Sequence, residues 1–502
     1  MKNSPSKTSS RKKTSAKVVE SATQISTWEN DPFSQAVPTD PPTLATPILR
    51  PVPQLGSTGP LPITINEPQP APRQYNSGTP EFRYWTAAEA LRRGGDFWAR
   101  ITGLGKWFTS VGRDLSVNLD AGEDFNAFYD RQNLDFFHGS VAGLTVFSGE
   151  SPDVVCHELG HAVLDALRPQ LFNAGFTETA AFHESFGDMS AILSALQLPS
   201  MRQDVLLETH GSLSRSSSLS RIAEQLGFAI QKVAPSAVEG DCLRNAANSF
   251  FYRDPATLPP TAPASTLSSE PHSFSRIFTG AFLDVLAGLL SVQADGNIPT
   301  DGQLLQVSEN AARYLVAAVR TAAVVPDYYS QVAAAMVDAS DPRDRNAVAG
   351  GFVHHGVLSL SAAVTAGSGV ARVAAAAPVK PGKEPADLGY ISVACAEYGL
   401  ESDTLLVHAT PEPSRLQASG AAFGVGSVPQ VGSDKAAKDF VEDLLQLGRI
   451  DFGSTKAGVS AFAHPFAHSR RVKTHEIVKE GKDLQLRRLR FDCGFDCGGC
   501  CS

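Results

Sequence analysis

The chain has 502 residues, which is enough for two to four domains and a large hydrophobic core. Its net charge is −9 and no strongly basic face is apparent, so we do not expect a nucleic-acid partner. We find no apolar run as long as a membrane span. The basic N-terminus is not followed by the apolar segment of a secretory signal, so the sequence as written predicts a cytoplasmic protein, or one exported by a non-classical route.

The chain divides into five segments by composition. Prolines at high density deny both helix and sheet hydrogen bonding, so we predict a disordered Ser/Pro/Lys-rich arm over residues 1–79. An ordered domain is expected over 80–360, followed by a linker over 361–387. Residues 388–452 resemble a small α/β accessory module, and 453–502 form a basic, Cys-rich tail.

The ordered domain is expected to have a β-rich lobe, 80–156, and an α-helical lobe, 157–360. The first lobe begins with a helix over 86–101, capped by Thr86. Alternating apolar residues then predict strands at 115–119, 126–130, 134–137 and 141–147. Helices are predicted at 157–169, 179–196, 273–293, 303–325, 328–339 and 345–358. Strands followed by helices, without βαβ alternation, indicate an α+β fold.

The strongest motif is His157-Glu158-Leu159-Gly160-His161, in an apolar helical run. Histidines at i and i+4 share one helix face and can bind one Zn²⁺, and Glu158 can reach a metal-bound water. The alternative is a helix with two ordinary surface histidines.

A second helix offers the missing ligand. Glu184 and Asp188 are also at i and i+4, so Glu184 can complete the metal site while Asp188 accepts a hydrogen bond from the non-ligating nitrogen of His157. An ordinary charged stripe is the alternative. The helix is otherwise apolar, so we expect a charged pair on it to bind a metal ion or an oppositely charged group.

These motifs resemble the thermolysin-like (gluzincin) zinc metallopeptidases, which combine HExxH with a downstream E-x-x-x-D. Three more stretches are similar to family segments in order and spacing: Asn126-Ala127-Phe128-Tyr129, Gly240-Asp241-Cys242-Leu243-Arg244 and His272-Ser273-Phe274-Ser275-Arg276. The resemblance covers roughly residues 80–360. It implies a thermolysin-like catalytic core with its cleft between the two lobes.

The resemblance also implies a role for each residue of the metal site. His157, His161 and Glu184 would bind one catalytic Zn²⁺. Glu158 would take a proton from a zinc-bound water as it attacks a peptide carbonyl, and pass it to the leaving amine. Asp165 would orient His161 or close its helix.

Four further residues are assigned by the same resemblance. His272 would act in catalysis and Arg244 would bind a substrate carbonyl, while Asn126 and Ala127 would pair with the substrate backbone. The predicted function is a zinc-dependent endopeptidase acting on peptide or protein substrates. The alternative is a non-catalytic zinc-binding scaffold or peptide-binding protein with the same fold.

The sequence departs from the family pattern in several places. The 169–179 loop has Phe172 and Phe176 but no tyrosine to stabilise the oxyanion. Leu267 stands where the family has an aspartate that orients the catalytic histidine, a role Glu270 could take. Asp153 matches a calcium ligand, but Ala195 replaces its expected glutamate partner, so we do not expect a structural Ca²⁺ site.

The last ten residues hold four cysteines: Cys493, Cys497, Cys500 and Cys501. Four thiolates can bind a metal, but the adjacent pair makes a single tetrahedral site awkward. We favour a flexible redox-sensitive tail. A peptide displayed for modification or self-cleavage is a third possibility.

Overall fold

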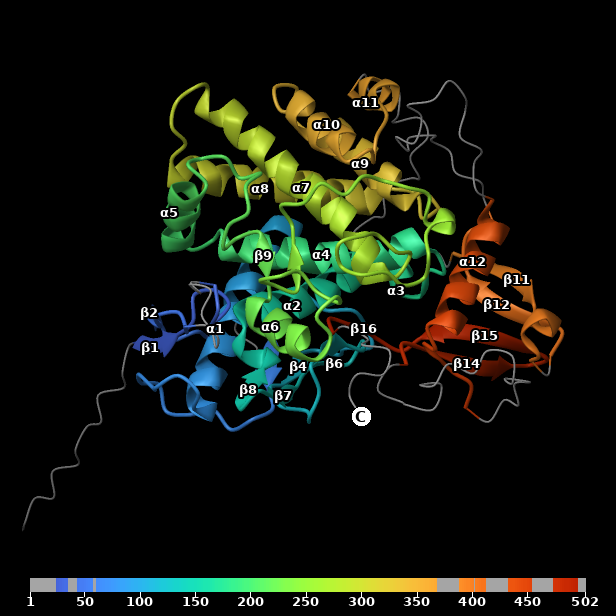
Figure 1. Ribbon diagram of the computed structural model, residues 1–502, viewed down its shortest axis with the longest axis horizontal. Coiled ribbons are helices and arrows are strands. Elements are labelled where there is room, and N and C mark those ends of the chain that lie inside the picture. Colours follow the sequence, from blue (N-terminus) through green and yellow to red (C-terminus); the bar gives the residue numbers. More distant parts are fainter. Residues whose placement is uncertain are drawn as a thin grey trace, which may run out of the picture.

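The computed structural model describes residues 24–34, 43–56, 60–367, 388–400, 402–411, 432–453 and 473–494. It is a mixed α+β structure with 45% helix, 16% strand and several small sheets. Figure 1 shows the long helices stacked above a strand-rich part, with a separate sheet at one side. The predicted α+β class is therefore confirmed at this level.

The strand-rich lobe is built on a five-stranded sheet in the order β16-β5-β6-β4-β3. Strands β3 (Ile63–Ile65), β4 (Leu115–Asn118) and β6 (Asn133–Phe136) run parallel, and β5 (Ala127–Tyr129) is antiparallel to β6. The outermost strand, β16 (Phe491–Asp492), comes from the C-terminal end and pairs antiparallel with β5. A separate hairpin follows in the chain: β7 (His138–Val141) and β8 (Leu144–Phe147).

The prediction of a disordered arm over 1–79 is wrong for the described part of that segment. Strands β1 (Gln24–Thr27) and β2 (Ile48–Pro51) form an antiparallel pair, and β3 also lies within the predicted arm. Most prolines lie outside these short strands, Pro51 ends β2, and several apolar side chains of the segment reach the core. Trp28 is 2% exposed and its ring meets Phe82 edge-on at 5.1 Å.

The first helix also begins earlier than predicted. Helix α1 spans Pro80–Thr102, and its N-cap is Thr79, whose hydroxyl accepts from the backbone N–H of Phe82. Thr86 lies inside the helix and is buried. A threonine before a proline at the first helical position is a known start signal, so the sequence did contain the correct boundary.

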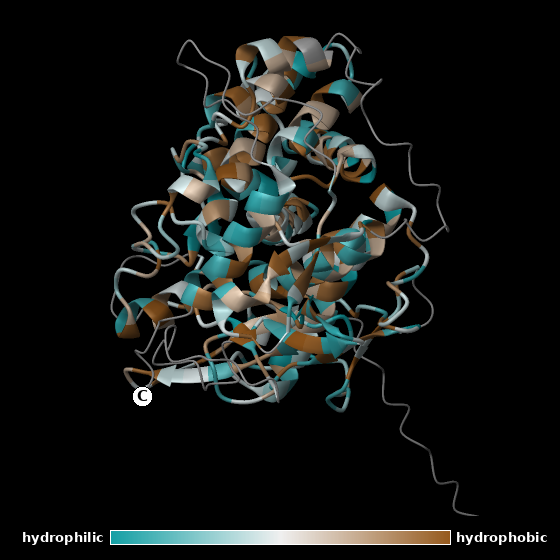
Figure 2. Ribbon diagram, turned by 90° about the vertical axis from the view of Figure 1, so that its right-hand side faces the viewer, coloured by the Kyte–Doolittle hydropathy of each residue, from teal (hydrophilic) through white to brown (hydrophobic). Residues whose placement is uncertain are grey.

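The helical lobe centres on three buried helices that pack in succession, with α2 (Pro152–Leu167) against α4 (Thr177–Ala195) and α4 against α7 (Pro271–Ala294). Ser151 caps α2, with Pro152 at its first position. Most helices carry both polar and apolar residues (Figure 2), as helices with one face on a core do. The other helices of the lobe are α3 (Gln170–Asn173), α5 (Pro199–Glu208), α6 (Glu224–Val233), α8 (Asp301–Thr321), α9 (Tyr328–Ala339), α10 (Arg345–His354) and α11 (Leu360–Gly367). The short strands β9 (Arg221–Ile222) and β10 (Arg244–Asn245), which precede and follow α6 in the chain, pair antiparallel with each other.

Helix α7 is long and apolar enough to cross a membrane by length and composition, although no membrane span was predicted. In this structure 67% of its most apolar stretch is buried, and it packs against α4 and α10. It therefore has the environment of a core helix.

The accessory module is a second five-stranded sheet, in the order β11-β12-β15-β14-β13, with helix α12 (Ser433–Gln446) against it. Its strands are β11 (Tyr390–Ala394), β12 (Thr404–His408), β13 (Ile450–Asp451), β14 (His475–Glu480) and β15 (Asp483–Arg488). The predicted end of the module at 452 is therefore wrong, because β14 and β15 come from the predicted tail. Most of the predicted linker lies outside the described residues.

The module docks on the helical lobe beside α3. The backbone N–H of Gly175 donates to the carbonyl of His408 at 2.8 Å, and Arg488 Nε donates to the carbonyl of Phe172 at 2.9 Å. Phe176 and Ala180 of the helical lobe join the apolar core of the module. After β15 the chain turns back into the strand-rich lobe as β16 (Figure 1).

Candidate metal centre

Two helices bring the predicted ligands together in the buried interior. His157 and His161 lie on one face of α2, with their rings edge-to-face at 4.8 Å, and α4 crosses in front of them with Glu184. A glycine on each helix permits this approach. A Cβ on Gly187 would lie 2.6 Å from the His157 ring, and one on Gly160 would lie 2.7 Å from Ser190.

The three predicted ligands converge as a metal would require. Glu184 Oε2 lies 3.4 Å from His157 Nε2, and Glu184 Oε1 lies 3.8 Å from His161 Nε2. Ligand atoms of all three residues fit within 4.8 Å of one another. Both Nε2 atoms and Glu184 Oε2 are buried without a hydrogen-bond partner. Buried polar atoms are seldom left without a hydrogen-bond partner, and these three side chains could hold a metal ion.

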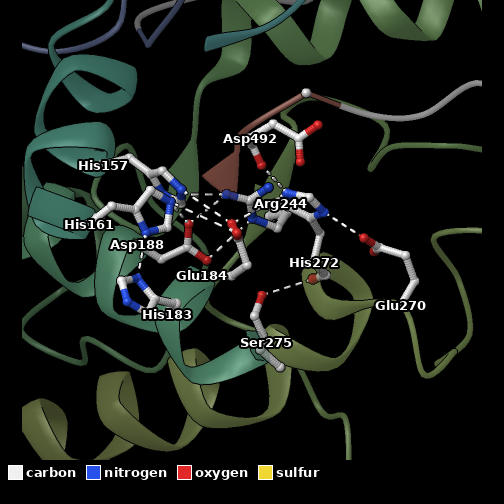
Figure 3. A network of polar contacts seen from close by, with 12 residues as sticks. His157, His161, His183, Glu184, Asp188, Arg244, Glu270, His272, Ser275 and Asp492 are labelled. Carbon is white, nitrogen blue, oxygen red and sulfur yellow. Dashed lines mark hydrogen bonds and ion pairs between the residues drawn. The ribbon is translucent and has the colours of Figure 1, made fainter. Parts of the chain in front are cut away.

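The orientation of His157 is set by Asp188, as the sequence predicted it could be (Figure 3). Asp188 Oδ1 lies 3.0 Å from His157 Nδ1 and accepts from Arg244 Nη2 at 2.7 Å. Burial alone would raise the pKa of Asp188, but Arg244 and the His157 bond outweigh it and hold the pKa below its usual value. Asp188 is thus a carboxylate that leaves Nε2 of His157 directed at the metal position.

The partner of His161 differs from the prediction. Its Nδ1 lies 3.1 Å from Nδ1 of His183, and burial lowers the pKa of both rings, so one neutral imidazole can donate to the other. Asp165 binds elsewhere: its carboxylate accepts from Tyr129 Oη at 2.9 Å and from Arg131 Nη2 at 2.7 Å. Asp165 therefore ties the last turn of α2 to β5 instead of orienting His161.

Glu158 and His272 are titratable groups beside the ligands with strongly shifted pKa values. Both carboxylate oxygens of Glu158 are buried without a hydrogen-bond partner, and burial raises its pKa to about 8. His272 is the second residue of α7, and its Nε2 lies 3.3 Å from Glu184 Oε2. Burial would lower the pKa of His272, but Glu184 and Glu270 raise it to about 10. The Nδ1 atom of His272 lies 2.6 Å from Glu270 Oε1, so Glu270 takes the orienting position that Leu267 cannot.

Two of the predicted substrate-binding residues, Asn126 and Ala127, lie beside β16, and the third, Arg244, lies on β10. Asn126 and Ala127 both contact the backbone beyond β16, through Asn126 Oδ1 and the Ala127 carbonyl. Arg244 is 5% exposed and lines a cavity of about 110 Å³ together with His272 and Cys493. Strand β16 could not be predicted, because a strand of two residues carries no periodicity.

A second group of buried acids was also missed. Asp31, Asp153 and Glu224 come from three separate segments, and their carboxylate oxygens lie within 4.8 Å of one another. Burial, and then repulsion from Asp31, raises the pKa of Asp153 to about 8. The place of Asp31 in this group could not be predicted, because Asp31 lies in the segment that was predicted to be disordered.

Comparison with known proteins adds no relative. No family model matches the chain, and no curated protein is similar to it. The resemblance to thermolysin-like peptidases therefore remains a prediction from the sequence motifs.

Proposed function

We propose that this protein is a zinc-dependent endopeptidase of the thermolysin-like type. The observation that carries the proposal is the convergence of His157 Nε2, His161 Nε2 and Glu184 Oε2, all buried and without a hydrogen-bond partner. The Glu158 carboxylate beside them also lacks a hydrogen-bond partner. Three protein ligands and a neighbouring carboxylate are what a hydrolytic zinc site requires. When bound, zinc would lower the pKa of water and polarise the peptide carbonyl.

The side chains around the ligands have matching tasks in this proposal. Glu158 accepts a proton from the attacking water and gives it to the leaving amine, and the burial that raises the pKa of its carboxyl makes it a stronger base than an exposed glutamate. His272 carries a positive charge below about pH 10 and donates through Nε2 to the oxygen where negative charge develops. The substrate backbone would lie antiparallel to β5, against Asn126 and Ala127.

One expected donor is missing. Phe172 follows α2 where a tyrosine of the family would stand, and its ring has no hydroxyl to give the oxyanion. Loss of one such donor costs about 3–4 kcal/mol of transition-state stabilisation. We therefore expect His272 to carry a larger share of the stabilisation than in family members with the tyrosine.

The test is cleavage of casein or a quenched peptide by the zinc-loaded full chain, compared with Glu158→Gln. We expect the variant to bind zinc normally and to lose at least about 100-fold in rate, since glutamine cannot accept the proton. A His161→Ala control should lose the zinc itself. A non-catalytic scaffold would instead bind zinc and show no cleavage that Glu158→Gln diminishes.

A further inference from the structure

The C-terminal strand lies where the proposed function places the substrate. Phe491 and Asp492 pair antiparallel with Tyr129 and Phe128 of β5. The backbone N–H of Cys493 then donates to the Ala127 carbonyl at 2.9 Å. Asn126 is also occupied, because the backbone N–H of Gly494 donates to Asn126 Oδ1 at 2.7 Å.

The side chain of Cys493 points into the metal centre. Its sulfur lies within 4.8 Å of ligand atoms of His157 and Glu158, in one buried group. Cys493 is 1% exposed and forms no disulfide. A thiolate is a strong zinc ligand, and a site with three protein ligands leaves one position open.

The flanking residues hold this strand in place by several independent contacts. The Phe491 ring stacks on His183 with centroids 3.9 Å apart, and on His161 at 5.1 Å. The Asp492 carboxylate forms a buried ion pair with Arg449 at 3.1 Å, and the Asp492 carbonyl contacts His272 Nε2 (Figure 3).

Gly494 packs closely against Asn126. A Cβ at this position would lie 2.5 Å from Asn126 Oδ1, so only glycine allows the backbone to approach so near. The four residues Phe491–Gly494 therefore match the cleft in backbone, side chains and shape.

We propose that Cys493 is the fourth ligand of the metal and that strand β16 is an intrachain inhibitor of the cleft. This inference rests on the proposed function, since it needs the metal at His157, His161 and Glu184. Cys493 binds as a thiolate and releases its proton to solvent. The thiolate then takes the position that the reacting water needs, and the backbone of the strand takes the place of the substrate.

The test uses Co²⁺, which reports sulfur ligation directly. The full chain is loaded with Co²⁺ under reducing conditions, and its thiolate-to-cobalt charge-transfer absorption is recorded for the wild type and Cys493→Ser. Cys395→Ser is the matched control, because Cys395 is an equally buried free cysteine within the module. We expect the band in the wild type and Cys395→Ser, and its loss in Cys493→Ser with about one cobalt still bound per chain.

Peptidase activity gives a second reading. Zinc-loaded Cys493→Ser should cleave a quenched peptide at least about tenfold faster than the wild type, because an intrachain ligand competes at millimolar effective concentration. Phe491→Ala keeps the thiol but removes its anchor, so it should weaken the cobalt band and raise the activity in the same direction. Circular dichroism establishes that each variant is folded.

The failures are distinguishable. Cobalt bound without a thiolate band, or a band that persists in Cys493→Ser, overturns the inference and leaves the proposed function standing. No bound cobalt overturns both. Mass spectrometry of the zinc-loaded wild type provides the last check, since a cut between residues 491 and 494 would make the strand a substrate and not an inhibitor.

Discussion

Asp188 links the metal ligands to the rest of the lobe, and replacing it by asparagine should weaken both zinc binding and the fold. Asparagine keeps the size and one oxygen for His157 Nδ1, 3.0 Å away, but removes the charge opposite Arg244. Breaking a buried ion pair costs about 3–5 kcal/mol of folding free energy. Losing the carboxylate behind a ligating histidine typically lowers metal affinity about 10–100-fold. We therefore expect both losses in Asp188→Asn.

The two effects are measured separately. Zinc affinity is obtained by competition with a chelator, and stability by urea unfolding of the metal-free protein, so that metal binding does not contribute to the unfolding free energy. The matched control is Asp165→Asn, another buried carboxylate on this pair of helices, bonded to Arg131 at 2.7 Å. It should be destabilised to a similar degree with unchanged zinc affinity. An unchanged affinity in Asp188→Asn, or an equal loss in both variants, would refute the assigned role of Asp188.

Two further predictions concern pH. Glu270→Gln should lower the pKa of His272 from about 10, because glutamine supplies no negative charge. The alkaline limb of the kcat/KM profile should then move to lower pH, and a limb that stays in place contradicts the pairing of His272 with Glu270. Asp153 keeps its proton up to about pH 8 in the folded protein but ionises near pH 4 in the unfolded chain. The free energy of unfolding should therefore decrease as the pH rises from about 4 to about 8. Urea unfolding across this range should show a smaller decline for Asp153→Asn, and an identical slope in the two proteins would count against the buried-acid group.

The grouping of His157, His161 and Glu184 was predictable because their positions follow helical spacing. The i, i+4 pairs His157/His161 and Glu184/Asp188 fix which side chains share a face, and the apolar context of both helices predicts that these faces are buried. Packing α2 against α4 then places the pairs together. The interaction of His161 with His183 could not be predicted, because it depends on how far one helix is rotated against the other.

The errors share a different cause. Strand β16 pairs with β5 across more than 350 residues of sequence, and nothing local in Phe491-Asp492 indicates a strand. In the same way, the composition of residues 24–56 suggests disorder, while Trp28 is buried only because α1 offers it a partner in Phe82. Long-range pairing of short segments is decided by tertiary contacts, which composition and periodicity do not report.

The accessory module determines how firmly β16 can close the cleft. Strand β15 ends at Arg488, whose side chain is bonded to Phe172 of the helical lobe, and β16 begins only three residues later. A fully extended chain spans about 3.3–3.6 Å per residue, so Cys493 stays within about 18 Å of Arg488 even when β16 has left the sheet. At such a separation the tether holds the thiol at an effective concentration in the millimolar range. Lasting access to the metal centre therefore requires that the module undocks from α3 as well, or that the chain between β15 and β16 is cut.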